Sequence, residues 1–409
     1  MNIKLLTYLF KIILIVCLIS ACTNSNQAKR ENTELSTTQV NIAVYLLLDK
    51  NFIGDCNQAK GIGNALIEIC KYNNINCSIK ELDITKNKTP RINTITEHND
   101  KKHIVIIIVG IGQSGINVFS KERFNNAYTI WAGHQAFDGL MRLANKVDMI
   151  ALPMHVITPE IDQVLRKSNT LLVKTSGVAH NLTVESLQQA KNNWNGAPLK
   201  KNARHLIGVF LGGDAPTSKG VMRYFTCEEA ALLGNYIARL AKKTGAFVIV
   251  TNGPRTGKYD PILKVKRPIH KENCTTDPTS AVFITQLQKE NVPYQFFDFQ
   301  YGKSSAYQAI LAVLIESGDT KIFVTGDSTS MISEICDLTA KQMVYVVDVG
   351  SMNDTHKAHA ISLCNTGKIS RMMLDGDAIT IVKQPAKNET YLPAAQAIAK
   401  HVINQINLG

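Results

Sequence analysis

Short apolar runs alternate with amphipathic segments along most of the chain. An unbroken run of aliphatic residues between turn residues predicts a buried strand, and apolar residues that repeat every three to four positions predict a helix. In the first half, these patterns predict strands at residues 40–48, 104–109, 127–131, 149–152 and 171–173, and a helix at residues 58–72. A polar stretch without periodicity follows at residues 192–204 and predicts a linker.

The second half repeats the alternation. Strands are predicted at residues 206–211, 247–251, 294–297, 322–325 and 344–349, and helices at residues 226–242, 304–316 and 391–406. Strands that alternate with helices form a parallel sheet in which each helix crosses over to the next strand. The predicted fold class is therefore α/β, with two Rossmann-like domains that face a cleft. The predicted boundaries are residues 40–192 and 205–385 for the domains, 193–204 for the linker and 386–409 for a C-terminal helix.

The first 39 residues differ from the rest in composition. Lys4 precedes an apolar run at residues 5–19, and the small residues Ser20 and Ala21 then lead to Cys22. A basic start, a short apolar run and small residues before a cleavage point form a signal peptide. Because a cysteine follows the small pair, residues 1–22 resemble a bacterial lipoprotein signal with lipid on Cys22, and a polar linker follows at 23–39. The alternative is an uncleaved membrane anchor, for which the apolar run is short. The predicted location is the bacterial cell envelope.

The composition is that of a globular protein with an excess of positive charge. Its 409 residues include 45 lysines and arginines against 33 aspartates and glutamates, which gives a formal net charge of +12. The lysines are scattered singly, without a basic stripe among aromatic residues, so nucleic-acid binding is not predicted. The charge suits phosphorylated ligands or an anionic membrane surface. The cysteines beyond the leader form no CxxC pair, so neither a metal site nor a disulfide framework is predicted.

The strongest chemical signal lies at residues 322–334. A predicted strand ends at Gly326, and a small, hydroxyl-rich turn leads from it into a helix. The residues of that turn are Asp327, Ser328, Thr329 and Ser330. Free amides at a helix start attract phosphate, and the hydroxyl groups add donors. Glu334 falls about two helical turns later, where a carboxylate can accept both hydroxyl groups of a ribose. The segment therefore predicts a pocket for a nucleotide or a nucleotide-sugar.

Two further strands of the second half end in turns that suit a ligand. Gly212 and Gly213 follow one strand, where backbone amides can approach a phosphate or sugar, or where a tight turn needs positive φ. Asn252, Arg255 and Thr256 follow the next strand. The arginine can bind phosphate oxygens, or it can be a solvated loop residue. Because three strand ends of one domain carry such turns, we expect them to form one ligand site.

The first half carries candidate residues of its own. Gly54, Asn57 and Gln58 precede or begin a predicted helix, and Gly133 and His134 follow a predicted strand. His134 can act as a general base, because imidazole titrates near neutrality, or it can cap the next helix. The sequence has no Ser-His-Asp order, HExxH or Walker motif, so a hydrolase triad, a zinc protease or a P-loop ATPase is not indicated.

These segments together resemble the mitochondrial-fission family of glycosyltransferases, which occurs in bacteria and plants and has the two-domain GT-B plan. The similarity runs in order over residues 40–380 and is best at residues 324–334. It implies a nucleotide-sugar donor on the second domain and an acceptor on the first, without a further cofactor, and a C-terminal helix that crosses back to the first domain. The implied donor-binding residues are Gly212, Gly213, Asn252, Arg255, Thr256, Gly326, Asp327, Ser328, Thr329, Ser330 and Glu334; the acceptor-side residues are Gly54, Asn57, Gln58 and Gly133, and His134 is the candidate base.

The sequence departs from the family pattern in the turn at residues 214–217, in an insertion at residues 264–277 and in the leader. The leader matters most, because nucleotide-sugars are made in the cytoplasm and an exported enzyme would be separated from its donor. The leading hypothesis is a membrane-associated glycosyltransferase. The alternatives are a non-catalytic, lipid-anchored protein of the same fold that binds a nucleotide or sugar, and a two-domain solute receptor.

Cys22→Ser is expected to abolish lipid attachment, because the thiol is the group that takes the lipid. The measurement is incorporation of a labelled fatty acid, together with fractionation of membranes. Cys17→Ser is the matched control, since Cys17 lies inside the apolar run and is expected to leave lipid attachment unchanged. A Cys22→Ser protein that migrates and fractionates like the parent would contradict the lipoprotein interpretation.

Overall fold

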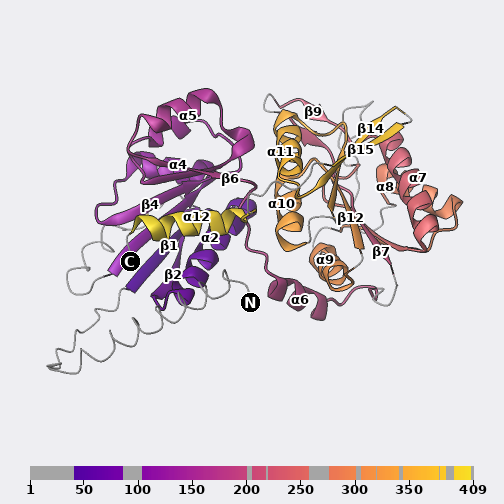
Figure 1. Ribbon diagram of the computed structural model, residues 1–409, viewed down its shortest axis with the longest axis horizontal. Coiled ribbons are helices and arrows are strands. Elements are labelled where there is room, and N and C mark those ends of the chain that lie inside the picture. The colour runs from indigo at the N-terminus through magenta and orange to yellow at the C-terminus, as the bar shows by residue number, and fades with distance from the viewer. Residues whose placement is uncertain are drawn as a thin grey trace, which may run out of the picture. The chain divides into compact units, whose positions relative to one another are not determined.

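The computed structural model describes residues 41–85, 104–199, 205–217, 220–257, 276–300, 305–318, 320–339, 344–376, 378–383 and 391–406. The leader, with Cys22 and the polar linker after it, lies outside the described residues. Within the described residues the chain forms two α/β domains, each built on one main sheet (Figure 1). No helix in these parts of the chain is both long and apolar enough to cross a membrane.

The first domain contains a six-stranded sheet in which every pairing is parallel. Its strands are β1 (Asn41–Leu48), β2 (Asn76–Asp83), β3 (Ile104–Ile111), β4 (Ala127–Ala132), β5 (Met149–Pro153) and β6 (Leu171–Thr175). The order across the sheet is β2-β1-β3-β4-β5-β6. The helices of this half are α2 (Ile53–Tyr72), α4 (Gly112–Lys121), η2 (Leu140–Leu143), η3 (Met154–Val156), α5 (Pro159–Arg166) and α6 (Val184–Asn192).

Helices cover both faces of this sheet, because successive side chains of a strand point to opposite faces. On β1, Val44 and Leu46 belong to a core shared with α2, whereas Tyr45 and Leu47 belong to a separate core that includes residues of α4, η2 and α5. A sheet that is buried on both faces needs apolar residues at consecutive positions, which explains the unbroken aliphatic runs of β1 and β3.

The second domain contains a seven-stranded sheet in the order β11-β10-β7-β12-β13-β14-β15, parallel except for the final β14–β15 pairing. Its strands are β7 (Leu206–Phe210), β10 (Phe247–Thr251), β11 (Tyr294–Phe297), β12 (Thr320–Thr325), β13 (Val344–Asp348), β14 (Ser370–Asp375) and β15 (Ala378–Lys383), and β8 (Ala215–Pro216) and β9 (Met222–Arg223) form a separate ribbon. The helices are α7 (Cys227–Thr244), α8 (Pro278–Lys289), α9 (Tyr307–Glu316), α10 (Thr329–Leu338), α11 (Asp354–Asn365) and α12 (Ala394–Gln405).

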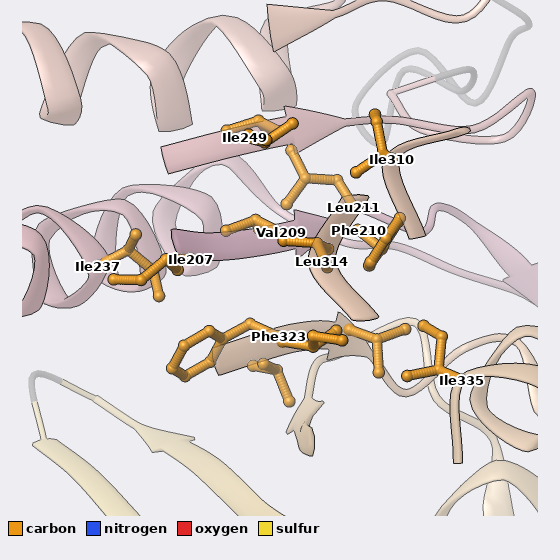
Figure 2. Close-up of a cluster of buried hydrophobic side chains, with 14 of the residues drawn as sticks. Ile207, Val209, Phe210, Leu211, Ile237, Ile249, Ile310, Leu314, Phe323 and Ile335 are labelled. Atoms are coloured by element: carbon orange, nitrogen blue, oxygen red, sulfur yellow. The ribbon is translucent and has the colours of Figure 1, made fainter. Parts of the chain in front are cut away.

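The core of the second domain surrounds β7, an inner strand that pairs with β10 on one side and β12 on the other. Figure 2 shows side chains of β7, β10 and β12 packed together with those of α7, α9 and α10. Gly208 of β7 lets helix α9 approach the sheet, because a Cβ atom at this position would lie 2.2 Å from a methyl carbon of Leu314. Strand β7 is buried along its whole length as a result.

The chain crosses between the domains twice. Helix α6 follows the last strand of the first sheet, but it packs against α9 of the second domain. Helix α12 returns to the first domain, where Ile398 and Val402 join the core beneath α2. This architecture, two Rossmann-like domains that face a cleft, confirms the predicted α/β fold class and is GT-B-like.

Some elements begin or occur where the sequence pattern did not predict them. Helix α2 begins at Ile53, five residues before the predicted start at residue 58, and no side chain caps its first turn, so the usual sequence signal is missing. Helix α12 begins at Ala394, after Pro393, whereas residue 391 was predicted. Strand β2 was not predicted because it is a polar edge strand without a fully buried residue.

Candidate functional site

The strand order reverses once in each sheet, between β1 and β3 and between β7 and β12. In open α/β sheets, ligands bind at the carboxyl ends of the strands beside such a reversal. Loops from both reversals line one cleft of about 550 Å³. Its lining includes Gly54, Asp55, Gln58, His134 and Gln135 of the first domain and Ala215–Thr217, Arg223, Arg255, Asp327–Ser330 and Asn353–His356 of the second. The cleft thus joins residues from both domains that the sequence singled out.

Two helices of the second domain begin at this cleft. Ser328 caps α10, and its hydroxyl group accepts a bond from the Met331 amide at 3.4 Å. Asn353 caps α11, and its side chain accepts a bond from the His356 amide at 2.9 Å. The first-turn residues of both helices line the cleft. Helix starts carry unpaired amides and a partial positive charge, which favour anions, and both starts face one space. Asp354, in the first turn of α11, also lines the cleft and adds a negative charge there.

Arg255 is held in the cleft by the loops around it. One guanidinium nitrogen donates to the Asp214 carbonyl oxygen at 3.2 Å, and the other donates to the carbonyl oxygen and a carboxylate oxygen of Asp327, each at 3.2 Å. Its side chain is still 39% exposed, whereas that of Asp327 is fully buried. Arg223 also lines the cleft and donates to the Met352 carbonyl oxygen at 2.9 Å. Both guanidinium groups are therefore positioned before any ligand arrives.

The Gly212–Gly213 pair lies behind the cleft. The Gly212 amide donates to the Thr325 hydroxyl group at 2.6 Å, and the Gly213 amide donates to the Asp327 carboxylate at 2.8 Å. Neither glycine has positive φ. A Cβ atom on Gly213 would lie 2.1 Å from the Arg255 carbonyl carbon. The glycines therefore permit close approach between loops, and both amides already have partners within the protein.

Four other predicted site residues lie within the scaffold. The Asn252 amide group donates to Asp277, Ser280 and Asp298, and Thr256, which is completely buried, donates to the Leu211 carbonyl oxygen at 3.1 Å. Gly133 and Gly326 are closely packed, because a Cβ atom on either would lie within 2.6 Å of a side chain. None of these four residues lines the cleft, but they shape the loops whose other residues line it. Asn57 does not line the cleft either.

Glu334 lies further along α10 and has a partner inside the protein. Its carboxylate accepts a bond from the Tyr307 hydroxyl group at 2.9 Å. Burial raises the pKa of Glu334, and the Tyr307 bond acts in the opposite direction. Glu334 does not line the cleft. Neither Tyr307 nor Glu334 lines the second cavity, although Ser305 and Ala306, directly before Tyr307, do.

The second cavity, of about 620 Å³, lies at the carboxyl ends of β10 and β11. Its walls carry Trp194 and several phenylalanines, and Trp194 packs edge-on against Phe297 with ring centroids 6.0 Å apart. The Trp194 indole donates to the Ala197 carbonyl oxygen at 2.9 Å, which fixes the ring. Rigid aromatic walls of this kind suit a flat, unsaturated ring.

The first domain places an acid beside the predicted base. His134 and Asp55 are 3.8 Å apart between Nδ1 and a carboxylate oxygen, and the Gln58 amide nitrogen lies 3.4 Å from the same ring nitrogen. Burial, and then the charge of Asp49, raises the pKa of Asp55 to about 6. Burial lowers the pKa of His134, so its imidazole is neutral at pH 7. His134 is about one-third exposed and Asp55 15% exposed, so both reach the cleft.

Sequence reasoning missed part of the lining. Asn353 and the residues after it follow a buried strand and form a capping box, the same strand-then-cap pattern that singled out Ser328. The pattern was present and could have revealed this second helix start. Asp55 and Gln135 adjoin residues that were predicted. Arg223 lies in the short β8–β9 ribbon, which carries no comparable signal.

Two Rossmann-like domains, a cleft at both strand-order reversals and a C-terminal helix that returns to the first domain define a protein of GT-B-like, glycosyltransferase-type fold. A family model described as "Mitochondrial fission ELM1" matches residues 53–264, just over half of the chain. The protein belongs to this family, which confirms the resemblance seen in the sequence.

Solved structures with a similar arrangement have little sequence identity to this chain. MurG from Acinetobacter baumannii is 10% identical, with a TM-score of 0.36 and coverage of 90% of this chain and 91% of MurG. The UDP-GlcNAc 2-epimerase from Methanocaldococcus jannaschii is 12% identical, with a TM-score of 0.41 and coverage of 90% and 100%. An apo structure of OtsA is 10% identical, with a TM-score of 0.35 and coverage of 90% and 92%. No curated protein sequence matches this chain.

Gly213→Ala is expected to displace the Arg255 loop and lower the free energy of unfolding by about 1–3 kcal/mol, because the new Cβ atom would overlap backbone atoms. Gly253→Ala in the same loop is the control: the nearest atoms would be 3.9 Å from its Cβ atom, and its φ is not positive. Thermal unfolding and amide exchange of residues 252–257 measure both effects. Equal stability of the two variants would contradict the close-approach explanation.

Proposed function

We propose that the protein is a membrane-associated glycosyltransferase that uses a nucleotide-sugar donor. The observation that carries the proposal is the single cleft in which two helix starts and two arginines of the second domain face the Asp55–His134 pair of the first. One side suits a diphosphate, and the other suits removal of a proton from an acceptor hydroxyl group. Membrane association rests on the leader with Cys22.

The donor diphosphate is assigned to the starts of α10 and α11, beside Arg255. Asp327 lies at the same place, but its buried carboxylate is bound by Arg255, by the Gly213 amide and by the Thr325 hydroxyl group. Its charge is therefore neutralised locally. The exposed part of the Arg255 guanidinium remains available to phosphate oxygens.

The nucleoside is assigned to the side of the cleft nearest β10 and β11. Glu334 would bind the ribose, as predicted from the sequence, and its bond to Tyr307 orients the carboxylate. The aromatic cavity beside Phe297 would hold the base by stacking.

The chemical step is assigned to His134. As a neutral imidazole it can take the proton of an acceptor hydroxyl group while that oxygen attacks the donor sugar and the nucleoside diphosphate leaves. The Asp55 carboxylate, 3.8 Å away, stabilises the imidazolium that forms. Gln58 helps to orient the ring.

The alternative is a non-catalytic, lipid-anchored protein that binds a nucleotide or sugar in the same cleft. The leader favours this alternative, because export would remove the protein from cytoplasmic nucleotide-sugars. A protein that binds a nucleotide but does not turn over the nucleotide-sugar would support this alternative over the transferase.

Ser330→Glu is expected to weaken nucleoside diphosphate binding at least about fivefold, because a like charge about 4 Å from a phosphate costs roughly 1–4 kcal/mol. Ser330 is exposed in the first turn of α10, where an acid is tolerated or stabilising. Gln396→Glu, an exposed first-turn position of α12, is the control and should leave affinity unchanged. Calorimetry with UDP, GDP and CDP measures both. If none of the three binds the parent protein, the transferase proposal is wrong.

His134→Gln is expected to lower turnover by a factor of about 10²–10⁴, the usual contribution of a general base, while nucleotide affinity stays the same. The parent rate should fall as the pH drops below 6.5, since the lowered pKa of His134 places its protonation on the acid side. Asp55→Asn should slow turnover as well. The measurement is release of nucleoside diphosphate from the nucleotide-sugar that calorimetry identifies. Unchanged turnover in His134→Gln would remove His134 from the chemical step.

A further inference from the structure

A pair of histidines lies across the boundary between the two domains. His155 belongs to η3 of the first domain and His359 to α11 of the second, and their ring centroids are 4.6 Å apart with the planes 37° from parallel. Both ring nitrogens of His155 and Nδ1 of His359 are buried without a hydrogen-bond partner among the described residues. The remaining nitrogen, Nε2 of His359, lies 3.5 Å from the Ser333 hydroxyl oxygen.

The contact around this pair is tight and uncharged. The Ser333 hydroxyl oxygen of α10 accepts a bond from the Val178 amide of the first domain at 3.0 Å. A Cβ atom on Gly177 would lie 2.8 Å from the same oxygen, so the backbone of this loop rests directly on α10. The histidine pair and the Ser333–Val178 bond therefore belong to one patch that joins the domains.

The titratable groups that act on the pair are also bases. His356 lies on α11 itself, and His134 comes from the loop after β4; the charge of either would disfavour a charge on His155. The charges of His155 and His356 likewise lower the pKa of His359. Beside the rings, helix α10 contributes the uncharged Ser333 and the loop at residues 177–178 contributes uncharged backbone. Four residues further along α10, Asp337 pairs across the boundary with His180 of the first domain at 3.0 Å. No carboxylate is among the groups that influence either ring.

We propose that His155 and His359 form a proton-sensitive latch: with both rings neutral the domains close over the cleft, and protonation of either ring opens it. A buried imidazolium without an acid partner is costly, whereas separation of the domains returns both rings to water. Unlike the assignment of the cleft to a nucleotide-sugar, the latch depends on the domain contact alone.

The latch is coupled to the cleft through the helices that carry it. Helix α11 bears His359 in its middle and lines the cleft with its first turn. Helix α10 bears Ser333 and lines the cleft with Thr329 and Ser330. When the latch opens, both anion-binding helix starts move away from Asp55 and His134. Acidification therefore separates the two halves of the site.

The direction of the pH effect follows from the burial of the rings. Burial lowers the pKa of His155 from 6.5 to about 4 and holds the pKa of His359 well below 6.5. Above pH 6.5 the histidines therefore do not oppose closure. As the pH falls from 6.5 toward 4, their protonation increasingly stabilises the open form relative to the closed form. At pH 5, the His155 shift alone lowers the ratio of closed to open molecules about 30-fold.

The test is small-angle scattering of the full-length protein between pH 7.5 and pH 5, with amide exchange of residues 177–178 as a local readout. The parent is expected to show a larger radius of gyration and faster exchange at pH 5. The double variant His155→Phe, His359→Phe keeps two packed rings that cannot be protonated, so it should stay closed throughout. His401→Gln on α12 is the control and should respond like the parent.

The single variant His155→Phe provides a second test in case the double variant does not fold. His155 is only partly buried, so its replacement is the milder change. It should reduce the response to pH, and its melting temperature at pH 7.5 should equal or exceed that of the parent. A parent whose radius and exchange do not change with pH would overturn the latch. The latch would also be overturned if the phenylalanine variants opened at pH 5 to the same extent as the parent.

Discussion

The buried carboxylate of Asp327 organises the second half of the site. It accepts bonds from the Gly213 amide, the Thr325 hydroxyl group and the Arg255 guanidinium, which come from the ends of β7 and β12 and from the loop after β10. A buried charge is tolerated only where it is paired and hydrogen-bonded, so these three loops cannot move independently. Arg255 is fixed and the start of α10 is aimed at the cleft for the same reason. The glycine pair permits this packing.

Helix α10 extends this constraint to the boundary between the domains. Its first turn lines the cleft, Ser333 in its middle bonds to the Val178 amide, and Asp337 near its end pairs with His180 at 3.0 Å and accepts a bond from the Tyr391 hydroxyl group. Asp337 thus touches both segments by which the chain passes between the domains. One helix therefore lines the cleft at its start and contacts the first domain further along.

Sequence patterns predicted most strands of the two sheets and the turns after them, because an aliphatic run followed by glycine or a capping residue is a local signal. They did not predict β2, β14 or β15. They did not predict which turn residues line the cleft. Gly212 and Gly213 look like phosphate-binding glycines in sequence, but their amides bond to side chains more than 100 positions away. The approach of Asp55 to His134 and that of His155 to His359 depend equally on how the elements pack. The local sequence shows which polar residues follow each strand, and the packing of the elements determines which of them bond to other parts of the protein.

Polar groups are satisfied differently inside the domains and between them. Within the second domain, Asn252 shares its two amide hydrogens among three side-chain oxygens and accepts a bond from the Phe299 amide. Five buried side-chain nitrogen and oxygen atoms among the described residues have no hydrogen-bond partner, and three of them belong to the His155–His359 pair. Each such atom costs roughly 1–3 kcal/mol. Three of the five atoms therefore weaken the contact between the domains, which the Ser333–Val178 bond and the Asp337–His180 pair strengthen.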